Sequence, residues 1–121
     1  MRHYPSDRVD LRSDTVTQPT SEMRKIMSSA IVGDDVLGDD STVNELQEYI
    51  ARILGKEAAL FVPSGTMSNA IAIKSQTKPG DEIVTHKKSH IYLYEGGGYA
   101  SLAGCSVSLV GGDKGIMSPG D

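Results

Sequence analysis

Apolar residues follow a helical rhythm in the first half of this chain and gather in short continuous runs in its second half. Between Thr20, a favourable N-cap, and Gly33, a helix stop, one helical stripe is formed by Met23, Ile26, Met27, Ala30 and Ile31. A second helix is predicted to begin at Thr42, which forms a capping box with Glu45, and to close at Gly55. The first half is therefore expected to be helical.

From residue 58 the pattern indicates strands that alternate with helices. The apolar run at 58–62 is typical of a strand buried on both faces of a parallel sheet. Further strands are predicted at 82–86 and 105–110, and helices at 67–74 and 90–103, although the last helix is weakened by three consecutive glycines. The order βαβαβ indicates an α/β fold with an open parallel sheet. Since three strands leave two open edges, we expect this α/β domain to be incomplete at residue 121.

Composition limits the partners and the compartment. Lys and Arg number 12 against 16 Asp and Glu, a net charge of −4, so no basic surface favours nucleic acid or an anionic membrane. No apolar run approaches the roughly 20 residues of a membrane span, and the first residues lack the apolar stretch of a secretory signal. The single cysteine, Cys105, cannot form an internal disulfide. These features predict a cytoplasmic protein that binds neither nucleic acid nor membrane.

The residues Ser64, Gly65 and Thr66 lie between a predicted strand and a predicted helix. Such a corner presents free backbone N–H groups and the positive end of the helix dipole, and a glycine lets a phosphate approach the backbone closely. The same residues also fit a plain turn with an N-cap, so both interpretations stay open at this point. A Walker lysine and the G-x-G-x-x-G dinucleotide pattern are both absent from the sequence.

Two histidines, His86 and His90, lie four residues apart, with Glu95 further along. The two lysines between them and the missing general base of H-E-x-x-H argue against a metal site, and we predict none. His90, followed by Tyr94 and Glu95, can supply a planar ring for stacking on a cofactor, although its spacing fits a capping or core histidine equally well. The segment 10–17, which contains Ser13, is polar and shows no periodicity.

Taken in order, five blocks resemble the low-specificity L-threonine aldolases, which are pyridoxal-phosphate (PLP) enzymes of the aspartate-aminotransferase fold type, fold type I. The blocks are residues 10–17, 32–36, 55–67, 79–82 and 89–95, so the resemblance runs along nearly the whole chain. It implies a PLP-dependent transferase-like fold. Residues 1–57 would form the N-terminal arm and helices, and residues 58–121 the first part of the large PLP-binding domain, which starts its sheet.

The resemblance also implies a function and residue roles. The complete subunit would cleave L-threonine or L-allo-threonine, small β-hydroxy amino acids, to glycine and acetaldehyde. Carried over by position, Gly65 and Thr66 would bind the cofactor phosphate, with Ser64 beside them, and Ser13 would bind the substrate carboxylate. His90 would stack on the pyridine ring, and Tyr94 and Glu95 would line the pocket near the reacting hydroxyl. A homodimer or homotetramer is implied as well.

The resemblance leaves alternatives. Family members commonly carry Tyr where this chain has Leu37, a residue near the site, which bears on substrate preference. In the family the Schiff-base lysine lies well beyond residue 121, so this stretch alone is expected to be inactive and to need the missing C-terminal part. A non-catalytic truncated product and a related β-eliminating PLP lyase are the competing interpretations.

Overall fold

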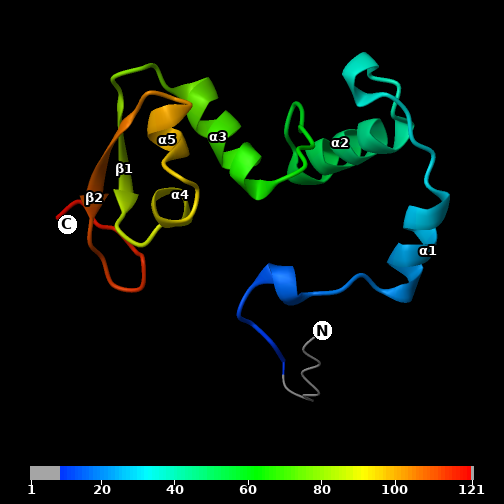
Figure 1. Cartoon of the computed structure of the whole chain (residues 1–121), viewed down its shortest axis with the longest axis horizontal. Coiled ribbons are helices and arrows are strands. Elements are labelled where there is room, and N and C mark those ends of the chain that lie inside the picture. The colour runs from blue at the N-terminus through cyan, green and yellow to red at the C-terminus, as the bar shows by residue number, and fades with distance from the viewer. Residues whose placement is uncertain (1–8, 121) are drawn as a thin grey trace. The chain divides into compact units, whose positions relative to one another are not determined.

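The computed structural model describes residues 9–120 and divides after Ala59 into two compact units. We describe each unit by itself. Figure 1 shows the helices α1 and α2 of the first unit and the elements from α3 to β2 of the second.

The first unit is helical, as its apolar spacing predicts. It contains the 3₁₀ helices η1 (Asp14–Val16) and η2 (Asp35–Leu37) and the α-helices α1 (Ser21–Ser29) and α2 (Ser41–Leu54). The N-cap prediction for α1 is confirmed, because the Thr20 hydroxyl accepts a hydrogen bond from the Met23 amide at 3.2 Å.

The helix α1 ends earlier than its apolar stripe predicts. The stripe extends to Ile31, but the backbone leaves the helix at Ala30. The hydroxyls of Ser28 and Ser29 both donate to the carbonyl of Lys25, at 2.8 and 3.1 Å. Hydroxyls that bond to the preceding turn in this way compete with helical backbone bonds and favour a helix end.

The prediction that Thr42 caps the second helix is wrong. Helix α2 begins at Ser41 with Asp40 as its N-cap, and the Thr42 hydroxyl donates to the Ile31 carbonyl instead. The buried Asp40 carboxylate accepts from the Val43 amide at 2.9 Å and from the Gly33 amide at 3.0 Å. Aspartate is at least as good an N-cap as threonine, and here it also holds the preceding loop.

Close backbone approach fixes glycine in that loop. A Cβ atom on Gly33 would lie 2.3 Å from the Asp39 carbonyl oxygen, which no side chain can tolerate. The Gly33 amide hydrogen bond, followed by that of Val43, lowers the pKa of Asp40 below its ordinary value of 3.8. The loop therefore depends on a charged carboxylate and on a glycine facing each other.

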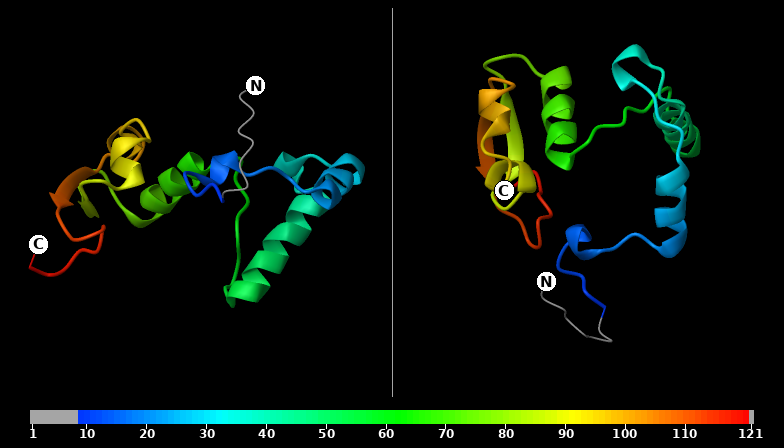
Figure 2. Two further views of the ribbon diagram at one scale, coloured as in Figure 1. Left: turned by 90° about the horizontal axis from the view of Figure 1, so that it is seen from below. Right: turned by 45° about the vertical axis from the view of Figure 1, so that its right-hand side comes forward.

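The second unit is built around two parallel strands, β1 (Glu82–His86) and β2 (Ser106–Val110). The register pairs Glu82 with Ser106 and His86 with Val110. Before the strands comes α3 (Gly65–Gln76), and between them lie the one-turn helices α4 (His90–Leu93) and α5 (Gly98–Ser101). Helix α3 packs beside α5 (Figure 1), and Figure 2 shows the second unit from two further sides.

Two predictions for the second unit are wrong. Residues 58–62 form no strand, because no strand among residues 9–120 pairs with them, and Leu60 and Phe61 are exposed. The helix predicted at 90–103 is broken at 94–97, where Gly96 and Gly97 adopt positive φ angles of 60° and 71°. Left-handed backbone at two successive residues cannot continue an α-helix. The strand at 82–86 is confirmed, and the last strand begins at Ser106, one residue later than predicted.

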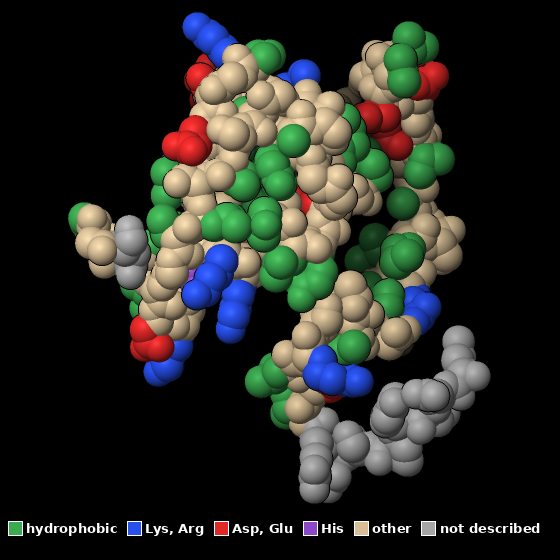
Figure 3. All heavy atoms as spheres, turned by 60° about the vertical axis from the view of Figure 1, so that its left-hand side comes forward, with side chains coloured by type: hydrophobic (Ala, Val, Ile, Leu, Met, Phe, Trp, Pro, Cys, Tyr) green, Lys and Arg blue, Asp and Glu red, His purple; other side chains and the backbone are tan. Residues whose placement is uncertain are grey.

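The buried residues of the second unit are few and small. Ala103 and Cys105 are buried just before β2, and the buried Thr85 hydroxyl donates to Ser89 at 2.9 Å. The Cys105 thiol lies 3.2 Å from the Thr77 hydroxyl and so joins the end of α3 to the start of β2. Many large apolar side chains among the described residues are exposed, and Figure 3 shows hydrophobic side chains (green) at the surface. No helix in the described part of the chain is long and apolar enough to cross a membrane.

The Asp40 contacts make a prediction about the loop and α2. In an Asp40→Ala variant the Gly33 and Val43 amides lose their acceptor, so their hydrogen exchange should accelerate on the order of tenfold. Because the pKa of Asp40 is lowered, the protection should be complete above about pH 4 and lost as the pH falls through the lowered value. Exposed Asp39→Ala is the matched control, and equal exchange in both variants would contradict the assignment.

Candidate functional site

The turn before α3 brings Ser64, Gly65 and Thr66 to the start of a long helix. The Ser64 hydroxyl accepts from the Met67 amide at 3.1 Å, and the Ser64 carbonyl accepts from the Ser68 amide at 3.1 Å. These two bonds leave the amides of Gly65 and Thr66 without an acceptor among the described residues. Two adjacent free N–H groups at the positive end of a helix dipole are suited to an anion.

Gly65 leaves open space at this helix start. A Cβ atom built there meets no atom within 4 Å, and Gly65 is not among the residues with positive φ. Neither steric crowding nor backbone conformation in the described chain therefore requires a glycine at this position. A group bound against the backbone would be a reason for it.

The other candidate residues gather around Glu95, in the break between α4 and α5. Its side chain is only 5% exposed, and its Oε1 atom lies 3.7 Å from His90 Nε2. The His90 side chain is 67% exposed, and its ring lies 5.2 Å from the Tyr94 ring at an angle of 43°. The structure thus brings His90, Tyr94 and Glu95 together, with the imidazole accessible to a ligand.

Asn69 joins this group and was missed by the sequence reasoning. Its Nδ2 atom donates to Glu95 Oε1 at 2.7 Å, a short bond from α3 to the break after α4. Asn69 stands in the second turn of the helix that Ser64 begins, so α3 links the two groups of candidate residues. The available signal was an asparagine inside a helix among Ala and Ile, a position that such a residue disfavours unless its side chain has a partner.

Ser13 lies in the first unit, where it caps η1. Its hydroxyl accepts from the Thr15 amide at 3.2 Å and lies 2.9 Å from the Thr15 hydroxyl. The neighbouring Arg12 guanidinium bonds to Asp10 and, together with the Arg12 amide, lowers the pKa of that carboxyl to about 2. The polar segment is therefore locally ordered around Ser13 instead of being the irregular loop that its sequence suggests.

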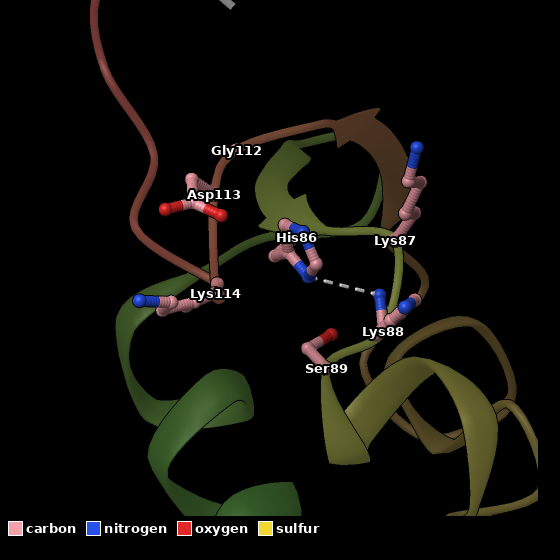
Figure 4. Close-up of a pocket in the computed structure, with 8 residues that line it drawn as sticks. His86, Lys87, Lys88, Ser89, Gly112, Asp113 and Lys114 are labelled. Carbon is pink, nitrogen blue, oxygen red and sulfur yellow. Dashed lines mark hydrogen bonds between the residues drawn. The ribbon is translucent and has the colours of Figure 1, made fainter.

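A hollow of about 600 Å³ lies where β1 and β2 end. Figure 4 shows His86 facing into it and bonded to the Lys88 amide at 3.1 Å, whereas the ammonium groups of Lys87, Lys88 and Lys114 point in different directions. Among residues 9–120, no three His, Cys, Asp or Glu side chains are grouped so that they could hold a metal ion.

Comparison with known proteins decides the family. The sequence profile of the family described as beta-eliminating lyase matches residues 10–121. The chain belongs to the beta-eliminating lyase family. Within it, the chain is 52% identical over 94 residues to a low specificity L-threonine aldolase of Escherichia coli (strain K12), a match that covers 78% of this chain and 28% of the relative.

Relatives from a plant and a yeast are also named low-specificity L-threonine aldolases. A probable low-specificity L-threonine aldolase 2 of Arabidopsis thaliana is 54% identical over 97 residues, which are 79% of this chain and 27% of the relative. A low specificity L-threonine aldolase of Saccharomyces cerevisiae is 43% identical over 99 residues, 81% of this chain and 26% of the relative. The chain therefore spans between 26% and 28% of the length of these three relatives.

The cap of α3 makes a stability prediction for this family member. Ser64→Ala removes the acceptor of the Met67 amide and should lower the free energy of unfolding by about 1 kcal/mol. Ser64→Asp should keep the stability of the parent protein, because aspartate caps as well as serine does. Thermal unfolding followed by circular dichroism measures both. Equal stability of the Ala and Asp variants would show that Ser64 is not a cap.

Proposed function

We propose that the complete protein uses PLP to cleave L-threonine or L-allo-threonine to glycine and acetaldehyde. The observation that carries this proposal is the high identity, over about four fifths of this chain, to relatives named low-specificity L-threonine aldolases. The family match supports it. So does the second unit, which contains both a candidate phosphate site at the start of α3 and the accessible imidazole of His90.

The proposed fold is that of the PLP-dependent transferases of fold type I. The second unit, with its parallel pair β1 and β2 and the preceding helix α3, would be the start of the large PLP-binding domain. The first unit would be the N-terminal arm and helices. The sheet would gain further strands from the rest of the subunit.

The residues at the start of α3 fit the phosphate of PLP. The free amides of Gly65 and Thr66 can donate to phosphate oxygens. We call the open space at Gly65 the phosphate cradle, and a larger side chain would obstruct it. The Ser64 hydroxyl accepts from Met67, which leaves its own hydrogen free to donate to the anion. When bound, PLP supplies an electron sink for breaking the Cα–Cβ bond of the substrate.

The second group of residues would act around the substrate. The exposed face of the His90 ring would stack on the pyridine ring. Ser13, a residue of the first unit, would donate to the substrate carboxylate, as the family resemblance implies. Glu95, with its carboxylate beside His90, is the residue suited to accept the β-hydroxyl proton, directly or through one water molecule. The Tyr94 phenol would line the same pocket.

We further propose a cytoplasmic homodimer or homotetramer in which a small β-hydroxy amino acid is the substrate. The single cysteine and the mildly acidic composition support a reducing, aqueous compartment. The Schiff-base lysine would come from the part of the subunit beyond this stretch, so residues 1–121 by themselves would be inactive.

The family description favours one other candidate function, elimination at Cβ of an amino acid. Both reactions need the same electron sink and differ in which bond at Cβ breaks. They are separated by their products, because retro-aldol cleavage gives an aldehyde and glycine, whereas elimination from a β-hydroxy amino acid gives a 2-oxo acid and ammonia.

The phosphate corner makes a cofactor-binding prediction. In the full-length protein, Gly65→Val should lower PLP affinity at least tenfold, because the valine occupies the cradle beside the free amides. Ser64→Asp should also lower it, since a carboxylate repels the phosphate although the helix cap is kept. Exposed Ser68→Val on the same helix is the matched control. The affinity is measured by titrating PLP and following its visible absorbance. Unchanged affinity in both variants would remove the phosphate assignment.

The activity prediction uses purified full-length protein with L-threonine and L-allo-threonine. Acetaldehyde should form in equal amount with glycine, and His90→Ala should lower kcat/KM by roughly 100-fold, whereas His90→Phe should keep part of the cofactor affinity because it retains a stacking ring. Acetaldehyde is followed by its reduction with alcohol dehydrogenase and NADH. Release of ammonia and a 2-oxo acid without acetaldehyde would establish the eliminating lyase instead.

A further inference from the structure

We infer that Asn69 is a positioning residue that holds the Glu95 carboxylate beside His90, and so fixes the geometry of both groups in the reaction. This inference rests on the proposed function for its effect on catalysis. The bond itself, from Asn69 Nδ2 to Glu95 Oε1 at 2.7 Å, is a feature of the second unit alone.

The side chain of Glu95 is buried. A carboxylate that is 5% exposed has lost most of its hydration, and it needs hydrogen-bond donors to stay in place. Among the described residues, Asn69 is the side chain that donates a hydrogen bond to the Glu95 carboxylate. His90 Nε2 lies beyond hydrogen-bond distance, at 3.7 Å from the same oxygen atom. The side-chain amide of Asn69 therefore fixes the position of Glu95 Oε1, and that position sets the distance from Glu95 to the imidazole of His90.

Asn69 and Glu95 stand on elements that differ in how strongly their backbones are constrained. Asn69 stands within the regular helix α3, four residues after Gly65, so its backbone position is fixed together with the proposed phosphate cradle. Glu95 stands in the short break between α4 and α5, which has few backbone bonds of its own. The bond thus transfers the position of the rigid helix to the less constrained segment. It sets the distance between the phosphate corner and the proton-accepting group.

The hydrogen-bond partner of Glu95 has to be a neutral donor. An amide NH₂ group donates to the carboxylate without neutralising it, so the second oxygen of Glu95 keeps its basic character. An aspartate at position 69 has nearly the same shape as asparagine but has only acceptors when ionised. It would repel Glu95 and displace the carboxylate from His90. Asn69→Asp therefore removes the interaction with a minimal change of volume.

The experiment is a double-mutant cycle in the full-length holoenzyme. We expect Asn69→Asp to lower kcat for threonine cleavage roughly 10- to 100-fold with little change in KM, because the proton acceptor is misplaced. In a Glu95→Gln background the same change should alter kcat less than about twofold, since its effect acts through Glu95. Ser75→Asp, which adds the same charge to an exposed position of α3, is the control.

Two readouts separate positioning from a purely structural role. PLP affinity should stay within about twofold of the parent in Asn69→Asp, because Asn69 does not contact the cradle residues through this bond. A crystal structure of the variant should show Glu95 moved away from His90. The combined variant Asn69→Asp with Glu95→Gln should recover thermal stability, because the glutamine amide can donate to the aspartate.

The outcomes are distinguishable. Equal losses of kcat in the Glu95 and Gln backgrounds, or an unmoved Glu95 in the crystal structure, would overturn the positioning role. If the parent enzyme cleaves no threonine, the proposed function fails by itself, and the crystal structure still decides the role of Asn69. A displaced Glu95 then supports the inference, and an undisplaced one overturns it.

Discussion

The parallel pairing of β1 with β2 is the constraint on which the second unit depends. Parallel neighbours cannot be joined by a tight turn, so the chain from His86 to Ser106 has to cross back to the opposite end of the sheet. That crossover is made of two one-turn helices, α4 and α5, with a left-handed break between them. The break places Glu95 against Asn69 of α3, which would not follow from one continuous helix. The strand pairing thus determines where the candidate carboxylate can lie.

The parts of the fold that could be predicted are those decided by neighbours in sequence. Spacing of apolar residues located α1, α2 and α3, and the strand predicted at 82–86 matches β1, because these signals are local. Asp40 was missed as a cap because Thr42 with Glu45 matches a capping box equally well. The choice between them depends on the Gly33 amide, seven residues before Asp40 in the chain, which donates a hydrogen bond to the Asp40 carboxylate. The apolar run at 58–62 predicts a strand. A strand forms only where it pairs with a neighbouring strand, however, and the composition of one segment does not show whether such a neighbour is present.

Some residues of the candidate site could be predicted from the sequence, and others could not. The start of α3 could be read directly, since Ser64, Gly65 and Thr66 are consecutive and their role follows from the geometry of any helix N-terminus. His90, Tyr94 and Glu95 could be named by resemblance, and their proximity follows from short sequence separation. Asn69 could not be found in this way, because it lies 26 residues from Glu95 and carries no motif of its own. Contacts of that kind are a property of packing, and the sequence contains only the weak signal of an unfavourable residue inside a helix.

The burial of the Glu95 carboxylate bears both on the stability of the second unit and on its proposed chemistry. A buried carboxylate with a single short hydrogen bond from a neutral amide is a poor contributor to stability, since its desolvation is only partly compensated. The arrangement is understandable if the carboxylate is needed as a base, because a group that is partly desolvated and held by a donor that leaves its charge intact is both reactive and fixed in direction. The exposed imidazole of His90, whose Nε2 atom lies 3.7 Å from Glu95 Oε1, is accessible to a ligand beside that base. Stability alone therefore does not explain the buried carboxylate, whereas the proposed chemistry needs it.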